Sequence, residues 1–219
     1  MNPSLFRLRL VRQYWSSGST DPRADREDAT SHGKVELLVH GEDLSGCDDP
    51  DTDYGINQSS VRLLQTLFGD HSPTLYRPSS PHRSFDPVFY HGCTLFGTCP
   101  NCVLDYRVRH RPEGLVCLDS FHVSGGLSPA DPDRFADRSV EVPLLQYANE
   151  VIPFAEQALS FLPVSRGADF EREMFDSLRK EHDFLLSMAR KLAAGASLSV
   201  ADRARGTAFE VETCQLPSE

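Results

Sequence analysis

Alternating apolar and polar residues near the N-terminus predict two half-buried strands. Over residues 5–12, apolar side chains at every second position share one face and arginines occupy the other. Over residues 34–40, three apolar residues recur with the same period. The polar segment at 16–33 predicts a mobile loop, across which the two strands can pair.

The clearest strand pattern lies at residues 89–123, where two alternating segments flank a turn at 111–114. In this hairpin we expect Val108 to lie opposite Cys117. One face is expected to be buried, and it carries Leu104, Tyr106, Val108, Leu115, Cys117 and Phe121. The other face is mixed, either a binding surface or a solvated face, and it carries Asp105, Arg107, Arg109, Ser120 and His122, alternating with Val103, Val116 and Leu118.

Apolar residues at helical spacing predict three helices. A short one covers residues 57–68, and two longer ones cover 144–162 and 170–193. Pro153 lies inside the second pattern and predicts a kink or a restart, because proline removes a backbone donor. Gly195 is the expected end of the third helix.

The order of these elements predicts the fold class. Strands dominate the first two-thirds of the chain and helices the last third. We therefore expect a single α+β domain over residues 1–195, with a mainly antiparallel sheet and the two C-terminal helices and the short central helix packed on one face. A second mobile loop is expected near 69–87, and residues 196–219 are expected to form a polar C-terminal tail.

Composition and charge narrow the functional classes. The 219-residue chain is 39% hydrophobic and 25% charged, which is typical of a globular protein. Its net charge of −10 argues against binding to nucleic acid or to an anionic membrane. The sequence has no apolar run of membrane-spanning length and no signal-peptide pattern at its start. We therefore expect a cytoplasmic protein with reduced thiols.

Four residues in the central stretch form the sharpest candidate site. His91, Cys93, Cys99 and Cys102 have a spacing that suits one structural zinc ion bound by three thiolates and an imidazole. The alternative is that the protein has no cofactor and these cysteines are buried and reduced. A redox dithiol at Cys99 and Cys102 is disfavoured, because a strand pattern and not a helix follows the motif.

Catalytic signatures are scarce, which favours a protein that is not an enzyme. The sequence contains no nucleophile elbow, phosphate-binding loop or dinucleotide-binding motif. His182 falls on the apolar stripe of its helix, where a hydrogen-bonded core histidine is expected more often than a base. A cysteine–histidine pair that meets only in the fold stays open as an alternative.

Three segments together resemble small uncharacterised bacterial cytosolic proteins, including immunity proteins of toxin systems. They are residues 33–41 (Gly-Lys-Val-Glu-Leu-Leu-Val-His-Gly), 53–68 (beginning Asp-Tyr-Gly-Ile-Asn-Gln) and 140–158 (beginning Val-Glu-Val-Pro-Leu-Leu). The resemblance covers about half of the chain and implies an acidic α+β protein. It carries no functional residues across.

These observations lead to one main hypothesis and two alternatives. The main hypothesis is a non-enzymatic acidic protein that binds a protein partner, as an immunity protein does. An acidic surface favours a partner with a basic face. The alternatives are a zinc-stabilised module that uses the 91–102 cluster, and a small enzyme that uses a thiol or a histidine.

Overall fold

A computed structural model describes residues 5–15, 18–21, 31–45, 53–72, 88–92, 98–124, 135–161 and 169–207. Within these ranges the side chains are described except at 90–103, 123–124, 136 and 169–175. Most of the loops expected at 16–33 and 69–87, and the last twelve residues of the expected tail, lie outside the described residues.

The described residues form two antiparallel sheets and four helices. Sheet A contains β1 (Phe6–Tyr14), β2 (His32–Val39), β3 (Glu42–Asp43) and β4 (Tyr54–Gly55). Sheet B has the order β5 (Phe89–Gly92), β6 (Thr98–His110), β7 (Leu115–Ser124) and β8 (Phe135–Pro143). The helices are α1 (Ile56–Gln65), α2 (Leu144–Leu159), α3 (Asp169–Ala193) and α4 (Val200–Thr207).

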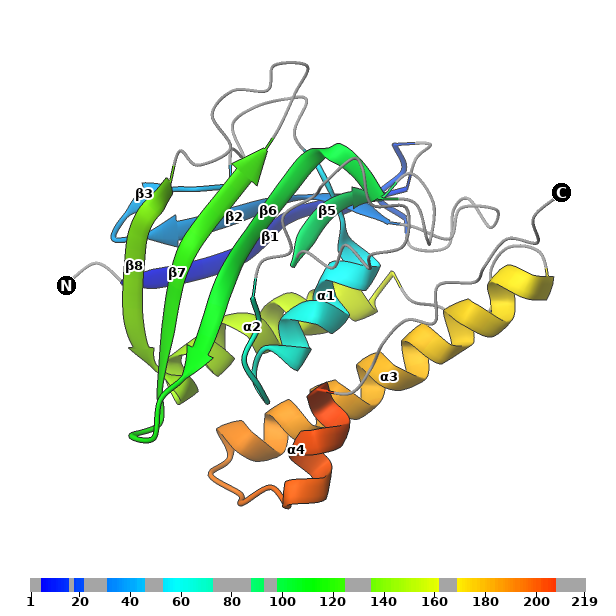
Figure 1. The fold of residues 1–219 in the computed structure, drawn as a ribbon. Coiled ribbons are helices and arrows are strands. Elements are labelled where there is room, and N and C mark those ends of the chain that lie inside the picture. The colour runs from blue at the N-terminus through cyan, green and yellow to red at the C-terminus, as the bar shows by residue number, and fades with distance from the viewer. Residues whose placement is uncertain are drawn as a thin grey trace, which may run out of the picture.

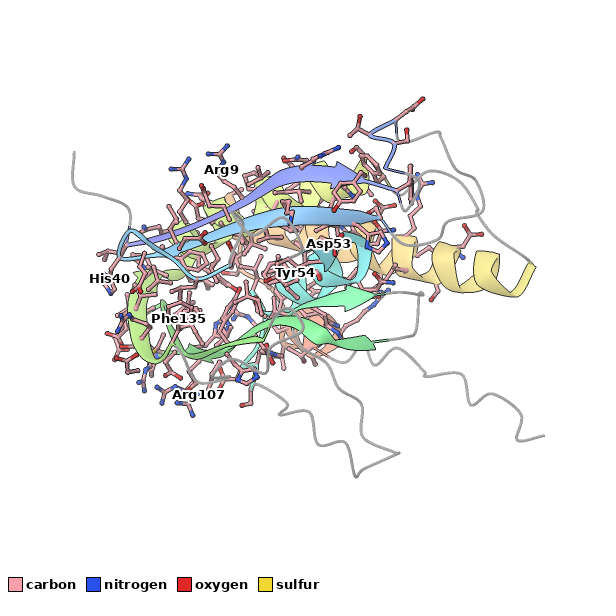
Figure 2. The ribbon with its side chains drawn as sticks, turned by 90° about the horizontal axis from the view of Figure 1, so that it is seen from above. Arg9, His40, Asp53, Tyr54, Arg107 and Phe135 are labelled. Carbon is pink, nitrogen blue, oxygen red and sulfur yellow. The ribbon has the colours of Figure 1, made fainter. Side chains whose placement is uncertain are left out.

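The two sheets face each other across a shared core, and α1 and α2 lie beneath them (Figure 1). Viewed from above, β1 and β2 run along one side and β6 along the other, with Tyr54 and Phe135 between them (Figure 2). His40 Nε2 donates to the Ser139 carbonyl at 3.1 Å and links β8 to the turn after β2. The sheets are therefore held together at this end by a direct hydrogen bond.

The core fills the space between the sheets and the helices. Phe89 contacts both Tyr54, with ring centroids 5.7 Å apart, and Phe154 of α2, also at 5.7 Å. The helix α3 packs against α1 and α2. Gly206 places α4 against Phe68, where an added Cβ would lie 2.9 Å from the ring. Burial of these apolar side chains is the main stabilising contribution to the fold.

The predicted α+β class is confirmed, and several elements match the sequence patterns. The strands β1 and β2 pair antiparallel, with Phe6 opposite Val39, and their apolar faces are buried. Gly195, with φ of 78°, ends α3 as expected. Of the kink or restart expected at Pro153, the restart does not occur, because α2 runs without interruption and places this proline on its exposed side.

One helix was not predicted, and one predicted strand begins earlier than expected. The helix α4 occupies residues that were expected to belong to a polar tail. It was missed because it contacts Phe68 through Gly206, and a glycine contact leaves no apolar stripe in the sequence. The strand β2 also begins at His32, inside the segment expected to be a loop. In the described part of the chain, none of the helices is long and apolar enough to cross a membrane.

Candidate functional site

The outward face of the β6–β7 hairpin carries a cluster of polar side chains around Asp119, which we call the Asp119 cluster. It consists of Arg107 and Arg109 from β6 and Cys117, Asp119 and Ser120 from β7. The antiparallel register places Arg107 opposite Asp119 and Arg109 opposite Cys117. Side chains opposite each other on neighbouring strands lie on the same face, so the four groups meet.

Both arginines donate to the same carboxylate. Arg107 Nε donates to Asp119 Oδ1 at 2.6 Å, and Arg109 Nη2 donates to Asp119 Oδ2. Ser120 Oγ donates to Oδ1 at 2.9 Å. The Cys117 sulfur lies 3.6 Å from Arg109 Nη2 and 3.6 Å from Asp119 Oδ2. Asp119 therefore fixes the position of two guanidinium groups at once.

The cluster keeps a net positive charge. Burial acts to raise the pKa of Asp119, but hydrogen bonds from Arg107, Ser120 and Arg109 outweigh it and hold the pKa below its usual value. The same carboxylate raises the pKa of Arg109. At neutral pH one negative charge is thus shared by two positive charges. Arg107 points away from the body of the protein on the side opposite to Arg9 (Figure 2).

A second arginine pair, on β1, provides a useful comparison. Arg7 and Arg9 lie 3.6 and 3.8 Å from the same Glu36 oxygen, which is too far for a normal hydrogen bond. Their carboxylate is also more exposed, at 23% against 10% for the Asp119 side chain. The arginines of the Asp119 cluster are therefore held more firmly than those of sheet A.

The predicted register of the hairpin is wrong by one residue, and this error placed Cys117 on the wrong face. Val108 pairs with Leu118, and Val116 and Leu118 are fully buried in the core. Between the pairs Asp105–His122 and Arg107–Asp119, β7 contains one extra residue. Ser120 lies at this bulge with a φ of 54°. The extra residue reverses which side chains of β7 face the core, so Phe121 and Cys117 lie on opposite faces although they are four positions apart.

Cys117 itself is almost buried, although it lies on the outward side of the sheet. The thiol contacts Arg109 and Asp119, neither of which is a histidine. Among the described side chains, Cys117 is the free cysteine. Cys47 and Cys214 lie outside the described residues. The contacts of Cys117 therefore do not form the cysteine–histidine pair that the sequence left open as a catalytic alternative.

A second polar arrangement ties the segment after α1 to β6. The backbones of His71 and Val108 exchange hydrogen bonds of 2.9 and 2.8 Å. Asp105 Oδ1 accepts from His71 Nε2 at 2.9 Å and from the backbone N–H groups of Val88 and Tyr106. Asp105 is 2% exposed, so these donors replace the water that Oδ1 would otherwise bind, whereas Oδ2 is buried without a partner among the described residues. Sequence reasoning missed this pair because 34 residues separate its members.

A pocket of about 240 Å³ lies beside His71, between the end of α1 and the last turn of α4. It is lined by Arg62, Gln65, Thr66, Gly69, Asp70, His71, Ser72 and Thr207. Much of this lining is already engaged within the protein. His110 Nε2 donates to the Thr66 carbonyl, and Asp70 accepts from the His110 backbone. These contacts indicate that the polar groups here fasten the end of α1 and the segment after it to β6.

The predicted metal ligands are described only at the level of the backbone. His91 lies directly opposite Cys99 in the β5–β6 register. The register then shifts, so that Tyr90 pairs with Val103 and the intervening residues of β6, including Cys102, have no partner on β5. Cys93 lies outside the described residues, as do the side chains of the other three. Within the described side chains, no three His, Cys, Asp or Glu residues gather to hold a metal ion.

His182 occupies the apolar stripe of α3, as predicted, and is fully buried. Burial lowers its pKa from 6.5 to about 4, and the backbone of Ala155 opposes this shift. Among the described residues, the Ala155 backbone is the polar group that acts on the ring, and its contact with the ring nitrogens is weak. The expectation of a core histidine is confirmed, and its hydrogen bonding is limited to a weak contact with the Ala155 backbone, so the ring is neutral at physiological pH.

Among the described residues, the Asp119 cluster is an outward-facing group in which one carboxylate orders two arginines. The Asp119 cluster presents guanidinium donors at fixed positions, which suits recognition of an anion. The His71–Asp105 pair is buried against the fold and serves to position it. The chain matches no protein-family model, no curated protein and no solved structure.

Proposed function

We propose that this protein is a non-catalytic cytoplasmic protein that binds a protein partner through the outward face of sheet B. The observation that carries the proposal is the Asp119 cluster, in which one carboxylate with 10% exposure orders two arginines with 40% and 39% exposure. Arginine is enriched among the residues that dominate binding energy at interfaces. Side chains that are ordered before binding lose less conformational freedom when the partner arrives.

The overall charge favours a partner with basic regions. The chain has a net charge of −10, which attracts basic surfaces at long range and accelerates their encounter. The resemblance to bacterial immunity proteins supports the same class of function, namely stoichiometric capture of a protein. The Asp119 cluster is local and adds specificity to this general attraction.

The test is affinity purification of the protein from its native host, followed by mass spectrometry. We expect one protein to be recovered in a stoichiometric amount at low and moderate salt. A toxin gene next to the gene for this chain would support an immunity role. Recovery of no stoichiometric protein under either condition would contradict the proposal.

A zinc-stabilised module is the second candidate, and the β5–β6 register favours it. His91 and Cys99 lie opposite each other, and the shift that follows leaves Cys102 in the unpaired part of β6. A zinc knuckle requires a local turn that brings two cysteines three positions apart to one ion, and the irregularity in β6 is where such a turn would form. The ligand set proposed is His91, Cys93, Cys99 and Cys102.

Metal analysis of protein purified without a histidine tag tests this candidate. We expect about one equivalent of zinc, because structural sites bind tightly. Cys99→Ser should lower the zinc content and the stability together, whereas Cys117→Ser should leave the zinc content unchanged. A wild-type content below about 0.2 equivalents would contradict a structural zinc site.

A further inference from the structure

We infer that Arg107 and Arg109 together form a receptor for the carboxylate of an aspartate or glutamate side chain on the partner protein. This inference rests on the proposed function and specifies its chemistry. It also adds a local requirement to the general attraction of basic surfaces, because the partner must present an acidic side chain at this point of the interface.

The hydrogen bonds within the cluster leave donors available. Arg107 uses its Nε for Asp119, and Arg109 uses its Nη2 for Asp119 and Cys117. Each guanidinium has five N–H donors, so one carboxylate cannot satisfy all the donors of two guanidinium groups. Arg109 Nε is buried and Arg107 Nε is engaged by Asp119, so the donors that a partner can reach are N–H groups on the Nη atoms of the two arginines. The pair therefore has unused donor capacity beside a net positive charge.

Geometry favours a carboxylate as the acceptor. Planar guanidinium groups bind carboxylates through two parallel hydrogen bonds, which an ammonium group cannot do. Arg107 and Arg109 are two positions apart on one strand and project from the same face. Their outer edges remain accessible, since each side chain is about two-fifths exposed.

Order combined with charge balance distinguishes the cluster from the arginine sites on β1 and β8. Arg7 and Arg9 share Glu36 only at 3.6 and 3.8 Å, so they must be ordered by any ligand that binds them. Arg138 donates to both Glu42 and Asp137 and lies between two negative charges. The Asp119 cluster is the opposite case, with two positive charges around one negative charge.

The first experiment uses peptides and needs no knowledge of the partner. A blocked tetraglutamate peptide is titrated into isotope-labelled protein, and the Nε–Hε signals of the arginines are followed by NMR. We expect the signals of Arg107 and Arg109 to shift first and furthest. A blocked tetraglutamine peptide of equal length should not shift them. Equal shifts at Arg9, or none at Arg107 and Arg109 up to about 10 mM peptide, would overturn the inference.

Variants separate hydrogen-bond geometry from charge. Arg109→Gln should weaken tetraglutamate binding about tenfold or more, and Arg109→Lys should recover only part of it, because lysine keeps the charge but loses the planar donor pair. Arg9→Gln is the matched control and should bind as the wild type does. Full recovery by Arg109→Lys would show that charge alone is sensed and would overturn the bidentate receptor.

The purified partner distinguishes failure of this inference from failure of the proposed function. If a stoichiometric partner is recovered and Arg109→Gln leaves its affinity unchanged, the partner-binding function stands and the carboxylate receptor is wrong. If no partner is recovered, the proposed function fails whatever the peptides do. Loss of partner affinity in Arg109→Gln but not in Arg9→Gln supports both.

Discussion

Replacement of His182 by leucine should make the protein more stable at neutral pH. The imidazole is fully buried in α3, and among the described residues its polar contact is a weak one with the Ala155 backbone. A buried polar group without a partner costs about 1–3 kcal/mol. Leucine has a similar volume and no polar atom, so the surrounding packing can accept it. We expect His182→Leu to raise the free energy of unfolding by about 1–2 kcal/mol at pH 7.

The same substitution should remove a pH dependence whose sign follows from the lowered pKa. The unfolded chain binds a proton at His182 near pH 6.5, whereas the folded protein binds it only near pH 4. Between these values the unfolded state holds more protons, so stability falls as the pH falls. The difference between the two pKa values corresponds to about 3 kcal/mol of stability once the pH is below both of them. About 2 kcal/mol of this stability is lost between pH 7 and pH 5.

Urea denaturation at pH 7 and pH 5 measures both effects. Trp15 is the single tryptophan of the chain and is fully buried, so its fluorescence reports unfolding. His182→Gln is the matched control, because it keeps a buried polar group but cannot titrate. Comparison with the wild type cancels the contributions of other acidic groups. If the wild type and His182→Leu lose equal stability between the two pH values, the burial-based account of this histidine is refuted.

Three further predictions concern the contacts that hold the fold together. Asp105→Ala leaves two buried backbone donors and the partly buried His71 without their acceptor, and it should cost about 3–5 kcal/mol in urea denaturation. A loss below about 1 kcal/mol would contradict the structural role given to this carboxylate. Gly206→Ala should destabilise α4 despite the higher helix propensity of alanine, because the new Cβ would lie 2.9 Å from the Phe68 ring. An increase of about 0.5–1 kcal/mol in the free energy of unfolding would refute this packing. Glu150→Ala frees the Leu8 backbone N–H at the edge of β1 and should increase self-association in analytical ultracentrifugation, which an unchanged monomer fraction would contradict.

Much of the fold follows from periodicity that is visible in the sequence. The alternation of Phe6, Leu8 and Leu10 with arginines predicts β1, and the apolar stripe from Leu178 to Leu192 predicts the C-terminal half of α3. Both patterns are local and strong, because each residue's burial depends on its own strand or helix face. They are also why the α+β class could be predicted from the order of the elements.

The errors arise where the structure departs from regular periodicity. The bulge at Ser120 moved Cys117 from the predicted core face to the outward face, and no glycine in β7 announces it. The Asp119 cluster was missed for the same reason, because the predicted register placed Arg107 away from Asp119. The His71–Asp105 pair joins segments that are distant in the sequence, and only the folded chain brings them together.

The proposal that sheet B is the partner-binding face is tested most directly by two matched double variants. Arg107→Gln/Arg109→Gln removes the charges of the Asp119 cluster, and Arg7→Gln/Arg9→Gln removes the same number of charges from sheet A. Each variant is first checked for wild-type circular dichroism and is then used to purify the partner from the native host. We predict that the first variant loses the partner and that the second retains it. Retention by the first variant, or equal loss by both, would contradict the assignment of this face.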